Sequence, residues 1–99
     1  MDKVKMYADE ICEELEGAKS YAECYVDSKI MNNSTSATRY KEMATDELKH
    51  ASYLHDMLIQ YMDDTKKAIQ VPKEMQDTWK ECNGDFVYKT AVVKQMLTL

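Results

Sequence analysis

Residues 40–62 read YKEMATDELKHASYLHDMLIQYM, and this stretch decides how the rest of the chain is interpreted. Its apolar residues recur at helical spacing, which predicts an amphipathic helix with one apolar stripe. Two polar residues, Glu47 and His50, occupy positions inside that stripe. We expect both to point into the core, where leaving either without a partner would cost several kcal/mol. The apolar members of the stripe are Tyr40, Met43, Ala44, Ala51, Leu54, Met57, Leu58 and Tyr61.

The composition of the chain predicts a single all-α domain over residues 1–99. A chain of 99 residues is long enough for one hydrophobic core. Hydrophobic residues make up 44% and charged residues 31%, as in ordinary globular proteins. With two Gly and one Pro, the chain has few turn-forming residues, whereas Ala, Leu, Met, Glu and Lys, which favour helices, are plentiful.

Charge and cysteine content argue against several classes of protein. The formal net charge of −5 argues against a nucleic-acid-binding module, because such modules carry a basic surface. Three Cys without a CxxC pair indicate neither a disulfide framework nor a Cys-based zinc site, and they fit a reducing cytosol. The N-terminus, MDKVKMYADEICEE, is acidic where a signal peptide is apolar, and no apolar segment of about 18 residues occurs. We therefore expect a cytoplasmic protein without nucleic-acid or membrane partners.

A third polar residue lies on an apolar stripe, in a different helix. Residues from about 3 to 30 keep helical periodicity, and within them Glu14 comes one heptad after Tyr7 and one heptad before Tyr21. Gly17 follows Glu14 by one turn, either as a Gly that the helix tolerates or because it lets two helices approach closely.

The segment 32–36, NNSTS, is the clearest break in the chain. Five consecutive small polar residues cannot bury a face, and the three hydroxyl residues at 34–36 are all suitable N-caps for the next helix. A short polar connection between two long helices predicts a long antiparallel helical hairpin.

Antiparallel pairing would bring the three polar residues together. With a short connection between the helices, Glu14 lies opposite about residues 49–52. Glu47 and His50 fall at that level to within about one turn. The sequence therefore predicts that two carboxylates and one imidazole meet in the core.

The remainder of the chain predicts one more helical segment. The second helix loses its apolar stripe at or soon after residues 63–64, so the hairpin spans about residues 3–66. A Pro suited to the first turn of a helix opens the segment at about 72–98. Asn83 and Gly84 leave two alternatives open, a break into two helices or one continuous helix. The apolar stripe of this segment comprises Met75, Trp79, Cys82, Phe86, Val93 and Leu97.

Glu-x-x-His on a helix places a carboxylate and an imidazole one turn apart, so both can bind one metal ion. In di-metal carboxylate bundles, two helices each supply one Glu and two others each supply Glu-x-x-His. One His and several carboxylates per metal suit iron or manganese. Three alternatives use the same residues: Glu47 and His50 reach water at the edge of the core, Glu14 and His50 form an ion pair without metal, or the set holds a single structural Zn²⁺ or other ion at the seam of a dimer.

Residues 42–51, EMATDELKHA, resemble the second-helix signature of the ferritin-like superfamily, and of rubrerythrins in particular. Glu14 followed one heptad later by Tyr21 resembles the first-helix signature of the same group. The separation of 33 residues between Glu14 and Glu47 also agrees with the first helical hairpin of that family. The resemblance implies that Glu14 and Glu47 are carboxylate ligands, that His50 is the imidazole ligand, and that Tyr21 supports the ligands without touching the metal.

The chain departs from full-length ferritin-like proteins after residue 62, where it contains no His to form a second Glu-x-x-His. It resembles half of a ferritin-like bundle, as half-length encapsulated ferritins do. A homodimer with two-fold symmetry would restore four Glu and two His, and with them two iron ions per dimer, with Mn or Zn possible instead. The resemblance implies oxidation of ferrous iron with O₂ or peroxide. The alternative is a non-catalytic helical scaffold that binds a partner and holds no metal.

Two aromatic residues outside this set have plainer interpretations. His55 lies outside the row formed by residues 40, 47, 54 and 61, so we expect it at the surface or its boundary. Trp79 is expected to anchor the third helical segment in the core.

Overall fold

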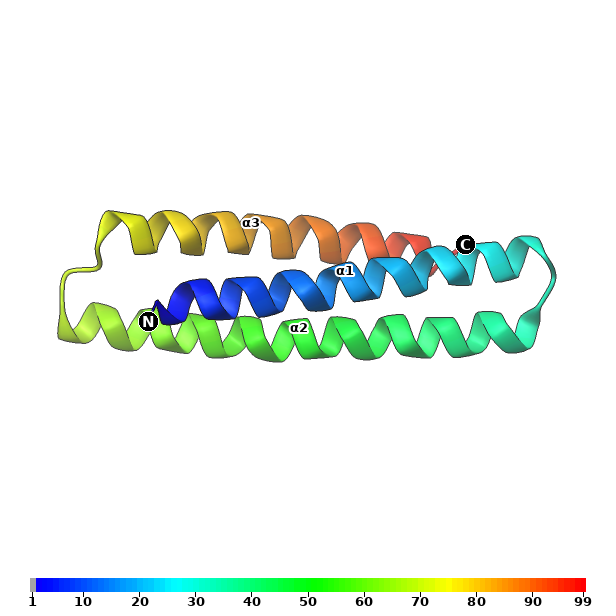
Figure 1. Ribbon diagram of the computed structural model, residues 1–99, viewed down its shortest axis with the longest axis horizontal. Helices are drawn as coiled ribbons and strands as arrows, with labels where there is room; N and C mark the ends of the chain where they lie inside the picture. The colour runs from blue at the N-terminus through cyan, green and yellow to red at the C-terminus, as the bar shows by residue number, and fades with distance from the viewer. Residues whose placement is uncertain (1) are drawn as a thin grey trace.

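A computed structural model describes residues 2–99 as three helices: α1 (Lys3–Ile30), α2 (Ser34–Ala68) and α3 (Lys73–Met96). No strand occurs within this range, so the all-α prediction is confirmed. α1 and α2 lie side by side and run in opposite directions, and α3 runs along α1 in the same direction (Figure 1). None of the helices in the described range combines the length and the apolar character that crossing a membrane requires.

Asn and Asp side chains determine where the first two helices begin. The Asp2 carboxylate accepts a hydrogen bond from the backbone N–H of Lys5 at 3.1 Å and caps α1. The Asn33 side chain accepts one from the N–H of Ser36 at 3.1 Å and caps α2. The N-cap is therefore Asn33, and the prediction of a hydroxyl cap at 34–36 is wrong. Asn32 has a positive φ of 55°, which Asn tolerates better than most residues, and this conformation turns the chain between α1 and α2.

α3 is one continuous helix. It begins directly after Pro72 and passes through Asn83 and Gly84 without interruption, so of the two alternatives for this segment the structure has the unbroken helix. α2 continues to Ala68, a few residues beyond the point where its apolar stripe ends. A helix can extend past its packed face because each added residue still gains a backbone hydrogen bond.

α3 packs chiefly against α1 and touches α2 much less. As a result, the apolar stripe predicted for α2 divides into a buried row and a neighbouring row that stays largely open. The open row includes two Met of the predicted stripe: Met43 is 40% exposed and Met57 is 52% exposed. Small side chains in the buried row let α1 and α2 approach closely, which favours burying that row. Its members are Ala37, Ala44, Leu48, Ala51, His55, Leu58 and Met62.

His55 belongs to the buried row, so the expectation that it lies at the surface is wrong. The residue is 9% exposed, and its ring stacks on Phe86 with centroids 4.0 Å apart and on Trp79 with centroids 5.6 Å apart. Its Nε2 donates a hydrogen bond to the Oδ1 of Asn83 at 2.8 Å. All three partners belong to α3, which covers a position that would otherwise be the edge of the α1–α2 pair.

The molecule is elongated, measuring 55 × 20 × 16 Å. Its radius of gyration is 16.0 Å, against about 13 Å for a compact chain of this length. α3 covers one side of the α1–α2 pair, and no helix within residues 2–99 covers the other side. We call this side the open face; it carries Glu14, Gly17, Tyr21, Met43, Glu47, His50 and Met57.

Candidate metal centre

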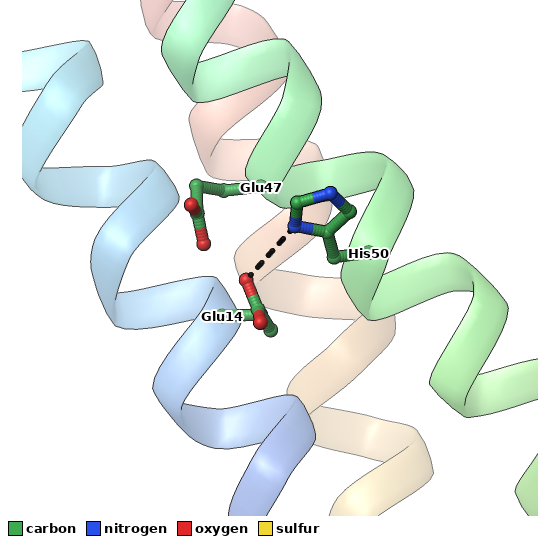
Figure 2. A group of neighbouring side chains, drawn as sticks. All are labelled: Glu14, Glu47 and His50. Carbon is green, nitrogen blue, oxygen red and sulfur yellow. Dashed lines mark ion pairs between the residues drawn. The ribbon is translucent and has the colours of Figure 1, made fainter.

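Glu14, Glu47 and His50 meet on the open face near the middle of the α1–α2 pair. One ligand atom of each lies within 4.8 Å of the ligand atoms of the other two. Figure 2 shows Glu14 projecting from α1 and the other two from α2, while α3 passes behind the pair. The structure thus brings together the three residues that the sequence selected. Within residues 2–99 no other group of three His, Cys, Asp or Glu side chains has its ligand atoms this close.

The three side chains are not equally shielded from solvent. His50 Nδ1 lies 3.5 Å from Glu14 Oε2, and the His50 side chain is 55% exposed while that of Glu14 is 29% exposed. The prediction that His50 points into the core is therefore wrong for the single chain. Its row on α2 faces away from α3, so the imidazole lies at the surface of the open face.

Glu14 holds a buried acceptor that its neighbours satisfy poorly. Its Oε2 is shielded from solvent and has no hydrogen-bond partner with good geometry among the described residues. It faces Glu47, whose pKa is raised because Glu47 can hydrogen-bond to Glu14 only when it carries a proton, because it is partly buried, and because Glu14 has a like charge. Two ionised carboxylates have no proton to donate to each other and repel. A proton on Glu47 relieves the repulsion, and a cation between the two carboxylates would relieve it as well.

These residues fit a divalent metal ion. Two carboxylates supply hard oxygen ligands, and the Nδ1 of His50 faces the same space. A mixed oxygen and nitrogen set of this kind suits iron or manganese and is also compatible with zinc. An unsatisfied buried carboxylate oxygen beside a second carboxylate is the feature that a cation would compensate.

Tyrosine pairs flank the three residues along the helices. The rings of Tyr21 and Tyr40 stack with centroids 6.5 Å apart, and the rings of Tyr7 and Tyr61 lie 6.4 Å apart. Tyr7 and Tyr21 are one heptad before and after Glu14, so each pair lies about two turns from the site. Tyr21 makes its aromatic contact with Tyr40, and its supporting role at the site stays a prediction.

Gly17 approaches the site from α1. A Cβ atom placed on Gly17 would lie 3.2 Å from the Oε2 of Glu47. The sequence left two explanations for this Gly, a Gly that the helix tolerates or a close approach of two helices. The atoms nearest to the added Cβ all belong to the Glu47 side chain, a predicted metal ligand, and none belongs to the backbone of α2.

No protein-family model, curated protein or solved structure matches this chain. The interpretation of the site therefore depends on its own geometry and chemistry.

Proposed function

We propose that this chain is a ferritin-like metal-binding protein in which Glu14, Glu47 and His50 bind iron, and that it oxidises ferrous iron with O₂ or peroxide. The observation that carries the proposal is the convergence of two carboxylates and one imidazole, from two different helices, with ligand atoms within 4.8 Å of one another. The unsatisfied Oε2 of Glu14 supports a cation at this point.

In this proposal each protein residue has a separate task. Ferrous ions bound at the site supply the electrons that reduce O₂ or peroxide. Glu14 and Glu47 compensate the positive charge of the metal, and a proton on Glu47 competes with the metal for its carboxylate. His50 must be neutral so that Nδ1 has a lone pair to donate. Its exposure leaves the imidazole accessible to an incoming ion.

A second copy of the chain would complete the site. Met43 and Met57 lie one heptad before and one heptad after His50 on α2, and both are substantially exposed. Packing two open faces across a two-fold axis would bury these Met side chains and bring together two sets of ligands. The resulting homodimer would hold four Glu, two His and two iron ions, as in di-metal carboxylate bundles.

A non-catalytic scaffold is the second candidate. The distance of 3.5 Å between His50 Nδ1 and Glu14 Oε2 is that of an ion pair, which needs no metal when His50 is protonated. The same three residues would also hold a single structural Zn²⁺, or manganese, without oxidase activity.

Metal content and mass, measured on one sample, separate these candidates. The full chain is purified without chelator, metals are quantified by mass spectrometry, and the molecular mass is measured by light scattering. We expect about one iron per chain in a homodimer or larger assembly, and O₂ consumption when ferrous iron is added anaerobically and air is then admitted. The absence of bound iron after anaerobic loading would contradict the iron proposal and favour the scaffold.

Substitutions assign the metal to these residues. We expect Glu47→Ala and His50→Ala to lose metal and oxidase activity while their mass stays that of wild type. Glu42→Ala is the matched control, because Glu42 is an exposed acid on the same helix. Metal retention by both ligand variants would contradict the assignment.

A charge on the open face tests the homodimer. Met57→Asp places a carboxylate where the second copy would pack, so we expect the variant to be monomeric and to bind metal more weakly. A dimer of unchanged stability would show that the chains associate through another surface.

A further inference from the structure

Gly17 occupies a position where Gly has no local advantage. It lies inside the 28-residue helix α1, where Gly destabilises the helix relative to Ala. No Gly in the described range has a positive φ, so the backbone conformation at this position is open to any L-residue. The reason for a Gly must therefore be the space that a side chain would fill.

The side chain of Glu47 borders that space. The three atoms nearest to a Cβ on Gly17 would be Oε2, Cδ and Cγ of Glu47, at 3.2, 3.5 and 3.7 Å. The closest of these contacts is tighter than ordinary van der Waals packing. By contrast, a Cβ on Gly84, the other Gly in the chain, would meet nothing within 4 Å.

The contact is with the movable end of a flexible side chain. An added methyl group at Gly17 would therefore displace the Glu47 carboxylate by a few tenths of an ångström, and it would not force α1 and α2 apart. The fold can absorb that shift at little cost. A metal site is less tolerant, because the distances between a metal ion and its ligands are fixed to within about 0.2 Å.

We infer that Gly17 is a positioning residue for metal binding, since the absence of its side chain provides the slot that holds the Glu47 carboxylate beside Glu14 and His50. This inference rests on the metal-binding function proposed above. Gly17 does not contact the metal itself, and a substitution at this position has two effects, one on helix stability and one on metal binding. Ala at this position improves the helix and weakens the site.

Gly17→Ala and Gly84→Ala form a matched pair of variants. Both replace a helical Gly with Ala, but only the first adds an atom near Glu47. In chelator we expect both to raise the melting temperature by a similar amount, roughly 4–8 °C. With Co²⁺ as the spectroscopic probe, we expect Gly17→Ala to bind about 10–100-fold more weakly than wild type, as is typical when a group that orients a ligand is changed. Gly84→Ala should bind Co²⁺ as wild type does.

Crystal structures of metal-free wild type and Gly17→Ala test the inference without any metal. We expect the Glu47 carboxylate to shift away from α1 in the variant while the two helices keep their spacing. An unshifted carboxylate would overturn the inference, and so would Gly17→Ala binding Co²⁺ as tightly as wild type. A Gly17→Ala protein less stable in chelator than wild type would also overturn it, because the slot would then serve helix packing. Failure of wild type to bind Co²⁺ would instead contradict the proposed function, and the carboxylate shift would still decide whether Gly17 positions Glu47.

Discussion

Replacing His55 with Ala tests how α3 is held against α2. Among residues 2–99, aromatic contact between these helices comes from His55, which stacks on Phe86 at a centroid distance of 4.0 Å and on Trp79 at 5.6 Å. The planes of His55 and Phe86 are inclined by 12°, so the two rings stack face to face. The N–H at Nε2 is also engaged, by Asn83 at 2.8 Å.

The cost of His55→Ala can be worked from these contacts. The hydrogen bond contributes about 1 kcal/mol, and a stacked aromatic pair contributes about 0.5–1.5 kcal/mol beyond the area it buries. The space left under α3 adds a cavity term. We therefore expect the free energy of unfolding to fall by roughly 3 kcal/mol, which lowers the melting temperature by about 4–8 °C per kcal/mol for a chain of this size.

Urea unfolding in the presence of chelator measures this change, at one protein concentration for all variants. Circular dichroism follows the helices, and the fluorescence of Trp79, the single Trp, follows the contact between α2 and α3. His50→Ala is the control; it removes the exposed His of the same helix and should cost less than about 0.5 kcal/mol. A His55→Ala cost below about 1 kcal/mol, or one equal to that of the control, would refute the stacking argument.

Two pH dependences follow from the ionisable groups. Hydrogen bonding of protonated Glu47 to Glu14, burial and the Glu14 charge raise the pKa of Glu47 above 4.5, so its contribution to the stability of the metal-free fold is complete below pH 4.5 and is lost as pH rises through the raised value. In urea unfolding with chelator, the free energy of unfolding of wild type minus that of Glu47→Gln should therefore fall as pH increases from about 4 to 7. A difference that stays constant over this range would contradict the prediction. Burial, followed by nearby acids, raises the pKa of the Cys82 thiol from 9.0 to about 11. The folded state therefore keeps a proton that the unfolded chain releases, and wild type should lose stability relative to Cys82→Ala as pH rises above about 9. A difference in the free energy of unfolding between wild type and Cys82→Ala that stays constant from about pH 8 to 10 would count against a buried thiol.

The parts of the structure that the sequence predicted are those that depend on local chemistry or on counting along a helix. Few turn residues and many helix formers predicted an all-α chain, and a short polar connection predicted its first two long helices. The convergence of Glu14 with Glu47 and His50 followed from a short connection and a rise of about 1.5 Å per residue. These quantities do not change with the way a third helix packs.

The parts that the sequence missed depend on where α3 lies. α2 carries two apolar rows, and periodicity cannot say which of them another helix covers. The Met-containing row matches the hydrophobic pattern well, yet the row with Ala44, Ala51 and His55 is the buried one. Burial of His55 requires the side chain of Asn83 as its hydrogen-bond partner, and that pairing joins residues 28 positions apart. Likewise, the role of Gly17 depends on its contact with the Glu47 side chain of another helix, which periodicity along one helix does not predict.

The three candidate ligands lie near the middle of the two longest helices, many residues from any helix end. Helix ends fray rapidly, whereas amides in the central turns of packed helices exchange with deuterium only when a large part of the fold opens. We therefore expect the amides in the turns that carry Glu14, Glu47 and His50 to be among the slowest to exchange in this molecule. Fraying at the termini leaves the spacing of the ligands unchanged, and a bound ion would be released through solvent on the open face rather than through local melting of its helices.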